Sequence, residues 1–158
     1  MYEKVYITKE KIKQFGFSYI DIDNSLKEIE NEYKNDNSLF SINNIFDKDY
    51  MNKYEKMSFS KELFEKILNK RIKTIQIGDE VLYTYGNVDI KDMFEKIILK
   101  YRIITINEIR KIINEEYEIE VSNSRIRNYI TDMEFYYNEI LDKVYADKND
   151  YYEEVYDE

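Results

Sequence analysis

Apolar residues recur every three to four positions along much of the second half of the chain, which predicts a series of amphipathic helices. Three segments carry such a stripe, at about residues 89–101, 107–117 and 122–136, and a short extended piece at 103–104 follows the first. The inward positions are Ile90, Phe94, Ile97 and Ile98; Ile109, Ile112, Ile113 and Tyr117; and Ile126, Tyr129, Ile130 and Met133. We therefore expect this half to be built on three packed helices.

The first half has a less regular pattern. Short helices are predicted near residues 8–15 and 25–33, residues 41–55 are expected to be irregularly helical, and a clearer helix begins at Ser60. Residues 72–85 are instead rich in β-branched and aromatic side chains, with Gly78 and Asp79 in the middle, so they predict a β-hairpin with a tight turn.

A second hairpin is predicted at residues 143–156, around the polar loop 147–150, with Lys143 facing Glu154 across the strands. The chain is therefore expected to be α+β and mainly helical. We predict an N-terminal unit over residues 1–86 and a C-terminal unit over residues 87–158, each ending in a β-hairpin.

Composition excludes several classes of chemistry. The 158 residues include no His, Cys, Pro or Trp, so imidazole bases, thiolate zinc sites and disulfides are excluded. Asp21 with Asp23, Asp47 with Asp49, and Asp147 with Asp150 are carboxylate pairs, but none has the spacing of a known metal loop. We therefore expect neither an enzyme nor a metal or cofactor, although a carboxylate-dependent nuclease fragment remains a minor alternative.

Charge and hydropathy limit the cellular setting. The N-terminus lacks the pattern of a signal peptide, and no apolar run approaches the ~18 residues of a membrane span, so a cytoplasmic protein is expected. The net charge is -9, and the last twelve residues hold six acids and one lysine. Acidity of this kind disfavours a generally basic nucleic-acid binder.

Arginine is the unusual residue type in this composition. Residue types with A/T-rich codons are abundant, which indicates an A/T-rich genome, and lysine greatly outnumbers arginine. The arginines are Arg71, Arg102, Arg110, Arg125 and Arg127, and four of them fall within 26 consecutive residues. Arg125 and Arg127 stand near the start of the predicted helix 122–136.

The order helix, short strand, helix, turn, helix, hairpin is that of a winged helix. Residues 105–113 and 121–130, with Val-Ser-Asn-Ser-Arg-Ile-Arg in the second stretch, resemble the helix-turn-helix of bacterial winged-helix repressors of the arginine-repressor and DeoR type. In those families a Val-Ser-x-Ser-x-Ile/Val-Arg stretch opens the recognition helix. The spacer 114–120 departs from that pattern, because it holds four Glu and no turn Gly. The first half matches this architecture loosely, as tandem winged-helix-like units would.

The resemblance implies a regulator of transcription or replication that binds double-stranded DNA, such as one from a mobile element, phage or plasmid. Regulators of this size often dimerise, so a homodimer that reads paired half-sites is expected. Ser122 would cap the recognition helix, and its first turns would face the major groove. The residues implied in DNA contact there are Ser122, Asn123, Ser124, Arg125, Arg127 and Asn128. Lys148 is expected on the wing, against backbone phosphate.

A different interpretation of the same residues is left open. Residues 87–138 hold eight basic and ten acidic groups, the reverse of what phosphate neutralisation favours. Arg125 is then expected to pair with Glu118, Glu120 or Asp132 in a solvated network. The protein would be an acidic winged-helix module that binds another protein in a transcription or mobile-element assembly.

Two further surfaces complete the sequence predictions. Lys70, Arg71 and Lys73 form a basic cluster that either faces phosphate or complements the dipole at the end of a helix. The acidic C-terminus is rich in tyrosine, a residue type enriched at protein interfaces, although codon bias and strand propensity also account for it. The residues predicted to contact a partner protein are Tyr145, Tyr151, Tyr152 and Tyr156.

Overall fold

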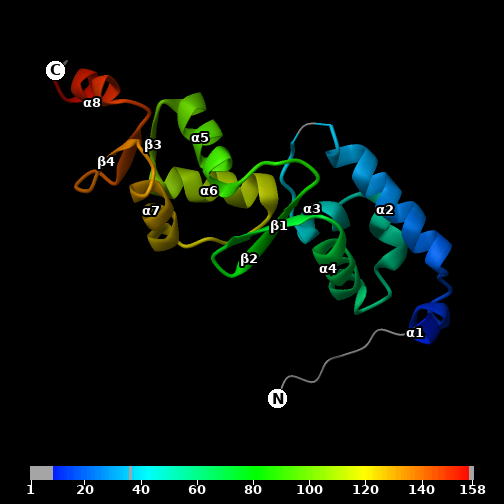
Figure 1. Ribbon diagram of the computed structural model, residues 1–158. Helices are drawn as coiled ribbons and strands as arrows, with labels where there is room; N and C mark the ends of the chain where they lie inside the picture. Colours follow the sequence, from blue (N-terminus) through cyan, green and yellow to red (C-terminus); the bar gives the residue numbers. More distant parts are fainter. Residues whose placement is uncertain (1–8, 36, 157–158) are drawn as a thin grey trace. The chain divides into compact units, whose positions relative to one another are not determined.

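The computed structural model describes residues 9–35 and 37–156 (Figure 1). The chain is α+β and mainly helical, with two small antiparallel sheets, and this confirms the predicted fold class. It divides into two units: Met1–Thr74 with Tyr83–Asn87, and Ile75–Leu82 with Val88–Glu158. This division differs from the predicted boundary after residue 86 in the first hairpin, whose distal part belongs to the second unit.

The first unit is built from helices of different lengths. They are α1 (Lys9–Gln14), α2 (Tyr19–Tyr33), α3 (Ile42–Phe46), the 3₁₀ helix η1 (Asp49–Tyr54) and α4 (Ser60–Arg71). Helix α2 begins well before the predicted residue 25, because Ser18 and Asp21 form a capping box at its N-terminus. Residues 41–55 are helical in two short pieces, as their irregular pattern predicts.

The core of the first unit lies between α2, η1 and α4. Ile29, Tyr54 and Phe64 are fully buried there, and the rings of Tyr54 and Phe64 meet edge to face at 5.1 Å. The Tyr54 hydroxyl lies 2.7 Å from the hydroxyl of the buried Ser25, so both polar groups are satisfied inside the core.

The predicted first hairpin is confirmed, with β1 at Lys73–Ile77 and β2 at Glu80–Thr84. Gly78 takes a φ of 61°, which suits glycine at the turn. At its proximal end, Tyr83 exchanges two backbone hydrogen bonds with Phe40, of 3.0 and 2.8 Å, within the first unit.

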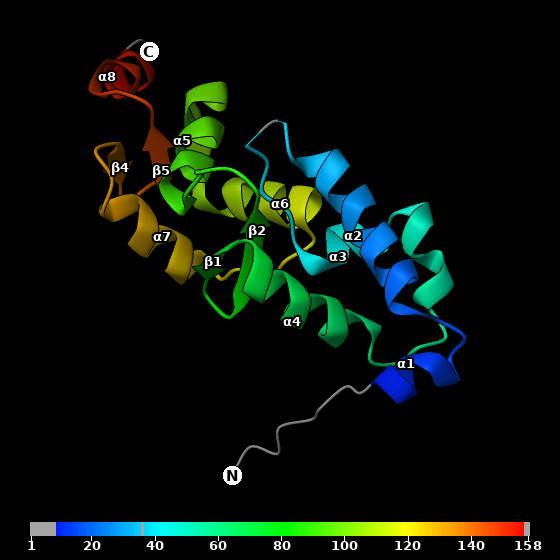
Figure 2. The same cartoon turned by 45° about the vertical axis from the view of Figure 1, so that its right-hand side comes forward.

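The second unit has helices both before and after a β-hairpin (Figures 1 and 2). The elements are α5 (Ile90–Tyr101), β3 (Ile103–Thr105), α6 (Ile106–Tyr117), α7 (Asn123–Thr131), β4 (Tyr136–Asn138), β5 (Lys143–Tyr145) and α8 (Lys148–Tyr156). The three strands form one antiparallel sheet in the order β3-β5-β4. Ile103 pairs with Tyr145, and Tyr136 pairs with the same residue from the other side.

Two boundaries predicted from the sequence are wrong in this unit. The helix expected to reach residue 136 ends at Thr131, because the chain turns at Asp132 and the aromatic residues after it enter β4. The hairpin expected at residues 143–156 is instead β4 with β5, and residues 148–156 are helical. Strand β5 is central in the sheet and has no free edge for residues 151–155 to pair with.

The core of the second unit includes much of the predicted stripes, but Ile90, Ile112, Tyr117, Tyr129 and Met133 are only half-buried, and the buried Met93 was not predicted. Each of α5, α6 and α7 buries apolar side chains, and the strand β5 adds Val144 and Tyr145. The fully buried residues include Phe94, Ile98, Ile106, Ile109, Ile113, Ile126 and Ile130. None of the helices in the described part of the chain has the length and apolar character needed to cross a membrane.

Candidate nucleic-acid interface

Helix α7 presents a polar face because its apolar residues are committed to the core. Ser122 caps the helix by accepting a hydrogen bond of 3.2 Å from the backbone N–H of Arg125. Ile126 and Ile130, one turn apart, are fully buried. At about 100° per residue, Ser124 and Asn128 lie on the opposite side of the helix, and both are exposed. The outward ridge of α7 is therefore small, uncharged and capable of hydrogen bonding.

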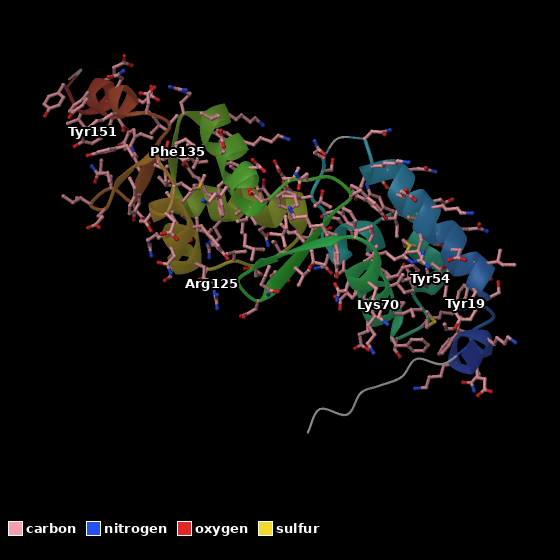
Figure 3. The ribbon with its side chains drawn as sticks, in the orientation of Figure 1. Tyr19, Tyr54, Lys70, Arg125, Phe135 and Tyr151 are labelled. Atoms are coloured by element: carbon pink, nitrogen blue, oxygen red, sulfur yellow. The ribbon has the colours of Figure 1, made fainter. Side chains whose placement is uncertain are left out.

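Arg125 lies on one flank of that ridge and points outward (Figure 3). Its aliphatic stem passes over Gly78 in the β1–β2 turn so closely that a Cβ on Gly78 would lie 3.0 Å from the Arg125 Cδ. Its guanidinium Nη2 is 3.8 Å from an oxygen of Asp79, with side-chain exposures of 53% and 97%. An ion pair this long and this exposed is weak, so another anion can replace Asp79 at little cost.

The acidic partner of Arg125 in the structure is none of the residues expected from the sequence. Glu118, Glu120 and Asp132 were the expected partners, and the structure places Asp79 beside the guanidinium instead. The backbone N–H of Gly78 also donates to the Tyr129 hydroxyl at 3.4 Å, so the turn lies along one side of α7. The Gly-Asp turn was visible in the sequence, but nothing local in the sequence indicates which helix it contacts.

Arg127, on the other flank, makes a strong pair. Its Nε and Nη2 donate to the two carboxylate oxygens of Asp142, both at 2.9 Å, and the Tyr137 hydroxyl donates to the same carboxylate. These hydrogen bonds, donated by Arg127 and accepted by Asp142, raise the pKa of Arg127 and lower the pKa of Asp142. Arg127 thus ties α7 to the β4–β5 hairpin, a role different from the predicted base contact.

Two other predicted DNA contacts are placed less favourably. Asn123 is half-buried, and its Oδ1 is enclosed without a hydrogen-bond partner, so this oxygen does not reach outward. Lys148 is exposed, but it begins α8 and does not lie on a wing as predicted. Of the α7 residues predicted to contact DNA, Ser124 and Asn128 on the ridge, with Arg125 beside them, remain accessible to a ligand.

The β4–β5 turn is apolar and acidic, which the sequence did not predict. Its residues are Glu139, Ile140, Leu141 and Asp142. Ile140 is 94% exposed, and the Asn138 side chain accepts hydrogen bonds from the backbone N–H groups of Ile140 and Leu141 at 3.0 and 3.1 Å. The turn is therefore held in a defined shape but offers no cation to phosphate.

The basic cluster of the first unit is exposed at the end of α4 (Figure 3 labels Lys70). Arg71 lies 3.6 Å from Asp23 of α2 and lines a half-open cavity of about 500 Å³ together with Tyr85. Lys27 and Glu30 also line this cavity, so its charges are mixed. Burial, followed by the charge of Glu30, raises the pKa of Tyr85 to about 12. Lys73 is exposed on β1.

The tyrosines predicted to contact a partner divide into buried and exposed groups. Tyr145 is fully buried between the rings of Tyr136 and Tyr151, at 6.0 and 5.2 Å, and its hydroxyl donates to Glu154. The prediction of Tyr145 as a surface contact is therefore wrong. Tyr152 and Tyr156 are exposed on α8, and Tyr151 is half-buried.

Across residues 9–35 and 37–156, no group of three or more carboxylates is placed so that it could hold a metal ion. No family model, curated protein or solved structure matches this chain.

Proposed function

We propose that the second unit is a winged helix that binds double-stranded DNA and that the protein is a non-enzymatic regulator of transcription or replication. The order α5, β3, α6, α7, β4, β5, with a sheet in the order β3-β5-β4, supports the winged-helix assignment. In this arrangement α7 is the recognition helix and the β4–β5 hairpin is the wing.

The observation that carries the DNA proposal is the outward ridge of α7. Ser124 and Asn128 are exposed, uncharged and one turn apart, beside an arginine whose ion pair is weak. Asn can bond adenine with two hydrogen bonds and Arg can bond guanine or phosphate, and both fit the first turns of a helix in the major groove. Core packing does not need polar residues at these positions, since Ile126 and Ile130 make the core contacts.

Fluorescence anisotropy of random duplex DNA at ~50 and ~200 mM salt tests the proposal. Binding should weaken steeply between the two salt concentrations, and Arg125→Ala should weaken it about fivefold or more at the lower one. Lys100→Ala is the matched control, because it removes an exposed cation from α5 in the same unit. Absence of binding at ~50 mM salt, or equal losses in both variants, would contradict DNA binding through α7.

A further inference from the structure

Helix α8 is unusual because none of its nine residues is buried. Isolated helices of this length are marginal in water, so α8 depends on contacts with the rest of the unit. On its inner side, Tyr151 packs against Tyr136 at 4.6 Å and Tyr145 at 5.2 Å (Figure 3 labels Tyr151). Glu154 accepts a hydrogen bond of 2.6 Å from Lys143 and another from the Tyr145 hydroxyl.

The beginning of α8 is fixed by a second set of contacts. Arg102 lies 2.7 Å from Asp147 and 2.9 Å from Asp150, and its backbone carbonyl accepts from the N–H of Ala146 at 2.8 Å. The Asp147 side chain also accepts from the N–H of Asp150, as an N-terminal cap does. The helix is therefore held in place before any partner arrives, which lowers the entropic cost of binding through it.

The outer side of α8 carries large side chains that these contacts leave in solvent. Tyr152, Val155 and Tyr156 are 43%, 38% and 73% exposed. They occupy positions i, i+3 and i+4, so they lie on one face of the helix, and the two tyrosine rings stack at 5.8 Å. Amphipathic helices that bind in a groove of another protein use anchors at this spacing, and tyrosine is favoured in such interfaces.

The charge of α8 decides between possible occupants of this face. Asp150 and Glu154 are paired with Arg102 and Lys143, so the remaining charges of the helix are those of Glu153 and Lys148, and Asp157 and Glu158 follow it in the sequence. A second copy of the chain would bring the same acids into contact, and duplex DNA would bring phosphates, so both are repelled. A protein with lysine or arginine around an apolar groove is attracted by the same charges.

We propose that α8 is a docking helix, which places Tyr152, Val155 and Tyr156 in an apolar groove of a partner protein whose rim carries lysine or arginine. This surface is separate from the ridge of α7, so the inference does not rest on DNA binding. It also refines the sequence prediction for the tyrosine-rich end, because the structure replaces a hairpin edge with a helix face and excludes Tyr145.

Photo-crosslinking with the full chain tests this proposal. p-Benzoylphenylalanine is placed at position 152 or 156 and, as a matched control, at the 94% exposed position 140 on the β4–β5 turn. The proteins are irradiated in a lysate of the host, and adducts are mapped by mass spectrometry. We expect a protein adduct from positions 152 and 156 but not from 140, attached within an apolar groove bordered by basic residues.

The captured protein is then purified and its binding measured by calorimetry. The double change Tyr152→Ala with Tyr156→Ala should weaken binding about tenfold or more, and Glu153→Lys should weaken it more at low salt than at high salt. Ile140→Ala should leave the affinity for the captured protein unchanged. The melting temperature of each variant tests whether its fold is intact. The proposal is overturned if positions 152 and 156 give no higher yield of protein adducts than position 140, or if they give adducts only to a second copy of the chain or to nucleic acid. It is also overturned if the double change leaves the affinity for the captured protein unchanged.

Discussion

Arg125 and Arg127 lie two residues apart on α7, yet their electrostatic surroundings differ. Arg127 makes two hydrogen bonds of 2.9 Å to Asp142, whereas the Arg125 guanidinium lies 3.8 Å from Asp79. The sequence identified both as exceptions in a lysine-rich chain, but it did not separate their roles. The difference depends on the acidic partner of each arginine. Asp79 lies far from α7 in the sequence and Asp142 lies in the β4–β5 turn, so no local pattern reveals these pairings.

Under the proposed function, the Asp79 carboxylate competes with DNA phosphate for the Arg125 guanidinium. We therefore expect Asp79→Asn to raise the affinity for random duplex DNA about two- to fivefold at ~50 mM salt, with a smaller effect at ~200 mM. Anisotropy titrations in the wild-type and Arg125→Ala backgrounds measure the coupling.

The gain from Asp79→Asn should disappear when Arg125 is absent. Glu95→Gln is the control, because it removes an exposed acid from α5 in the same unit. Equal gains in both backgrounds would mean that Asp79 acts through net charge alone. If neither the wild type nor Asp79→Asn binds duplex DNA, the proposed function itself fails.

The Asp142 carboxylate should make the stability of the second unit depend on acid. Its pKa is lowered from 3.8, chiefly by the hydrogen bond from Arg127, so its contribution is present above about pH 4 and is lost as the pH falls through the lowered pKa. Asp142→Asn should lower the melting temperature by a few degrees at pH 7, with a smaller difference near pH 2.

Circular dichroism melts from pH 2 to pH 7 measure this difference. Asp132→Asn, which changes an exposed acid at the end of α7, serves as the comparison and should leave the melting temperature nearly unchanged. A gap between wild type and Asp142→Asn that stays constant down to pH 2 would contradict an ionic role for Asp142.

At the scale of elements, the sequence predicts best where the pattern is local and periodic. The stripes at residues 89–101 and 107–117 become α5 and α6 almost to the residue, because their apolar positions decide both the helix and its buried face. The hairpin at 143–156 fails for a non-local reason. Both edges of β5 are occupied by β3 and β4, and this pairing cannot be read from the segment itself.

The spacer between α6 and α7 lacks the glycine that commonly ends a helix, and the structure shows what replaces it. Glu118 follows α6 in the left-handed region, with φ of 53° and ψ of 41°. Because this conformation costs a residue with a Cβ about 1 kcal/mol or more, Glu118→Gly should raise the free energy of unfolding by roughly 0.5–1 kcal/mol.

Urea denaturation of Glu118→Gly and of a control variant, Glu115→Gly, measures the effect of glycine on the free energy of unfolding. Glu115→Gly places the same substitution inside α6 and should instead lower the free energy of unfolding by about 1 kcal/mol. Destabilisation by Glu118→Gly would show that contacts of the glutamate side chain outweigh its backbone strain.

For the molecule as a whole, the distribution of charge matters more than its total. Residues 1–86 hold 14 basic and 15 acidic groups, whereas residues 87–158 hold 10 and 18. Residues 87–158, which make up most of the unit proposed to bind DNA, are thus the more acidic part of the chain. The affinity of this unit for random duplex DNA is expected to be low but measurable at ~50 mM salt, and under the proposed function hydrogen bonds from the ridge of α7 decide where it binds.

Some acids near the end of the chain form the ion pairs that hold α8, and these are left unchanged in the following test. Asp147, Asp150 and Glu154 form ion pairs, whereas Glu153 is exposed in α8 and Asp157 and Glu158 follow it in the sequence. The triple change Glu153→Gln, Asp157→Asn and Glu158→Gln should raise the affinity for random duplex DNA about two- to tenfold at ~50 mM salt.

The salt dependence of that gain identifies its cause. Long-range repulsion between exposed charges is screened over about 8 Å at physiological ionic strength, so the affinities of wild type and triple variant should converge as the salt concentration rises. Anisotropy titrations between ~50 and ~300 mM salt measure this, and Glu10→Gln with Glu28→Gln neutralises exposed acids in the first unit as a control. A gain that persists at ~300 mM salt would show instead that the acidic end covers the ridge of α7 directly, because a steric effect is not screened by salt.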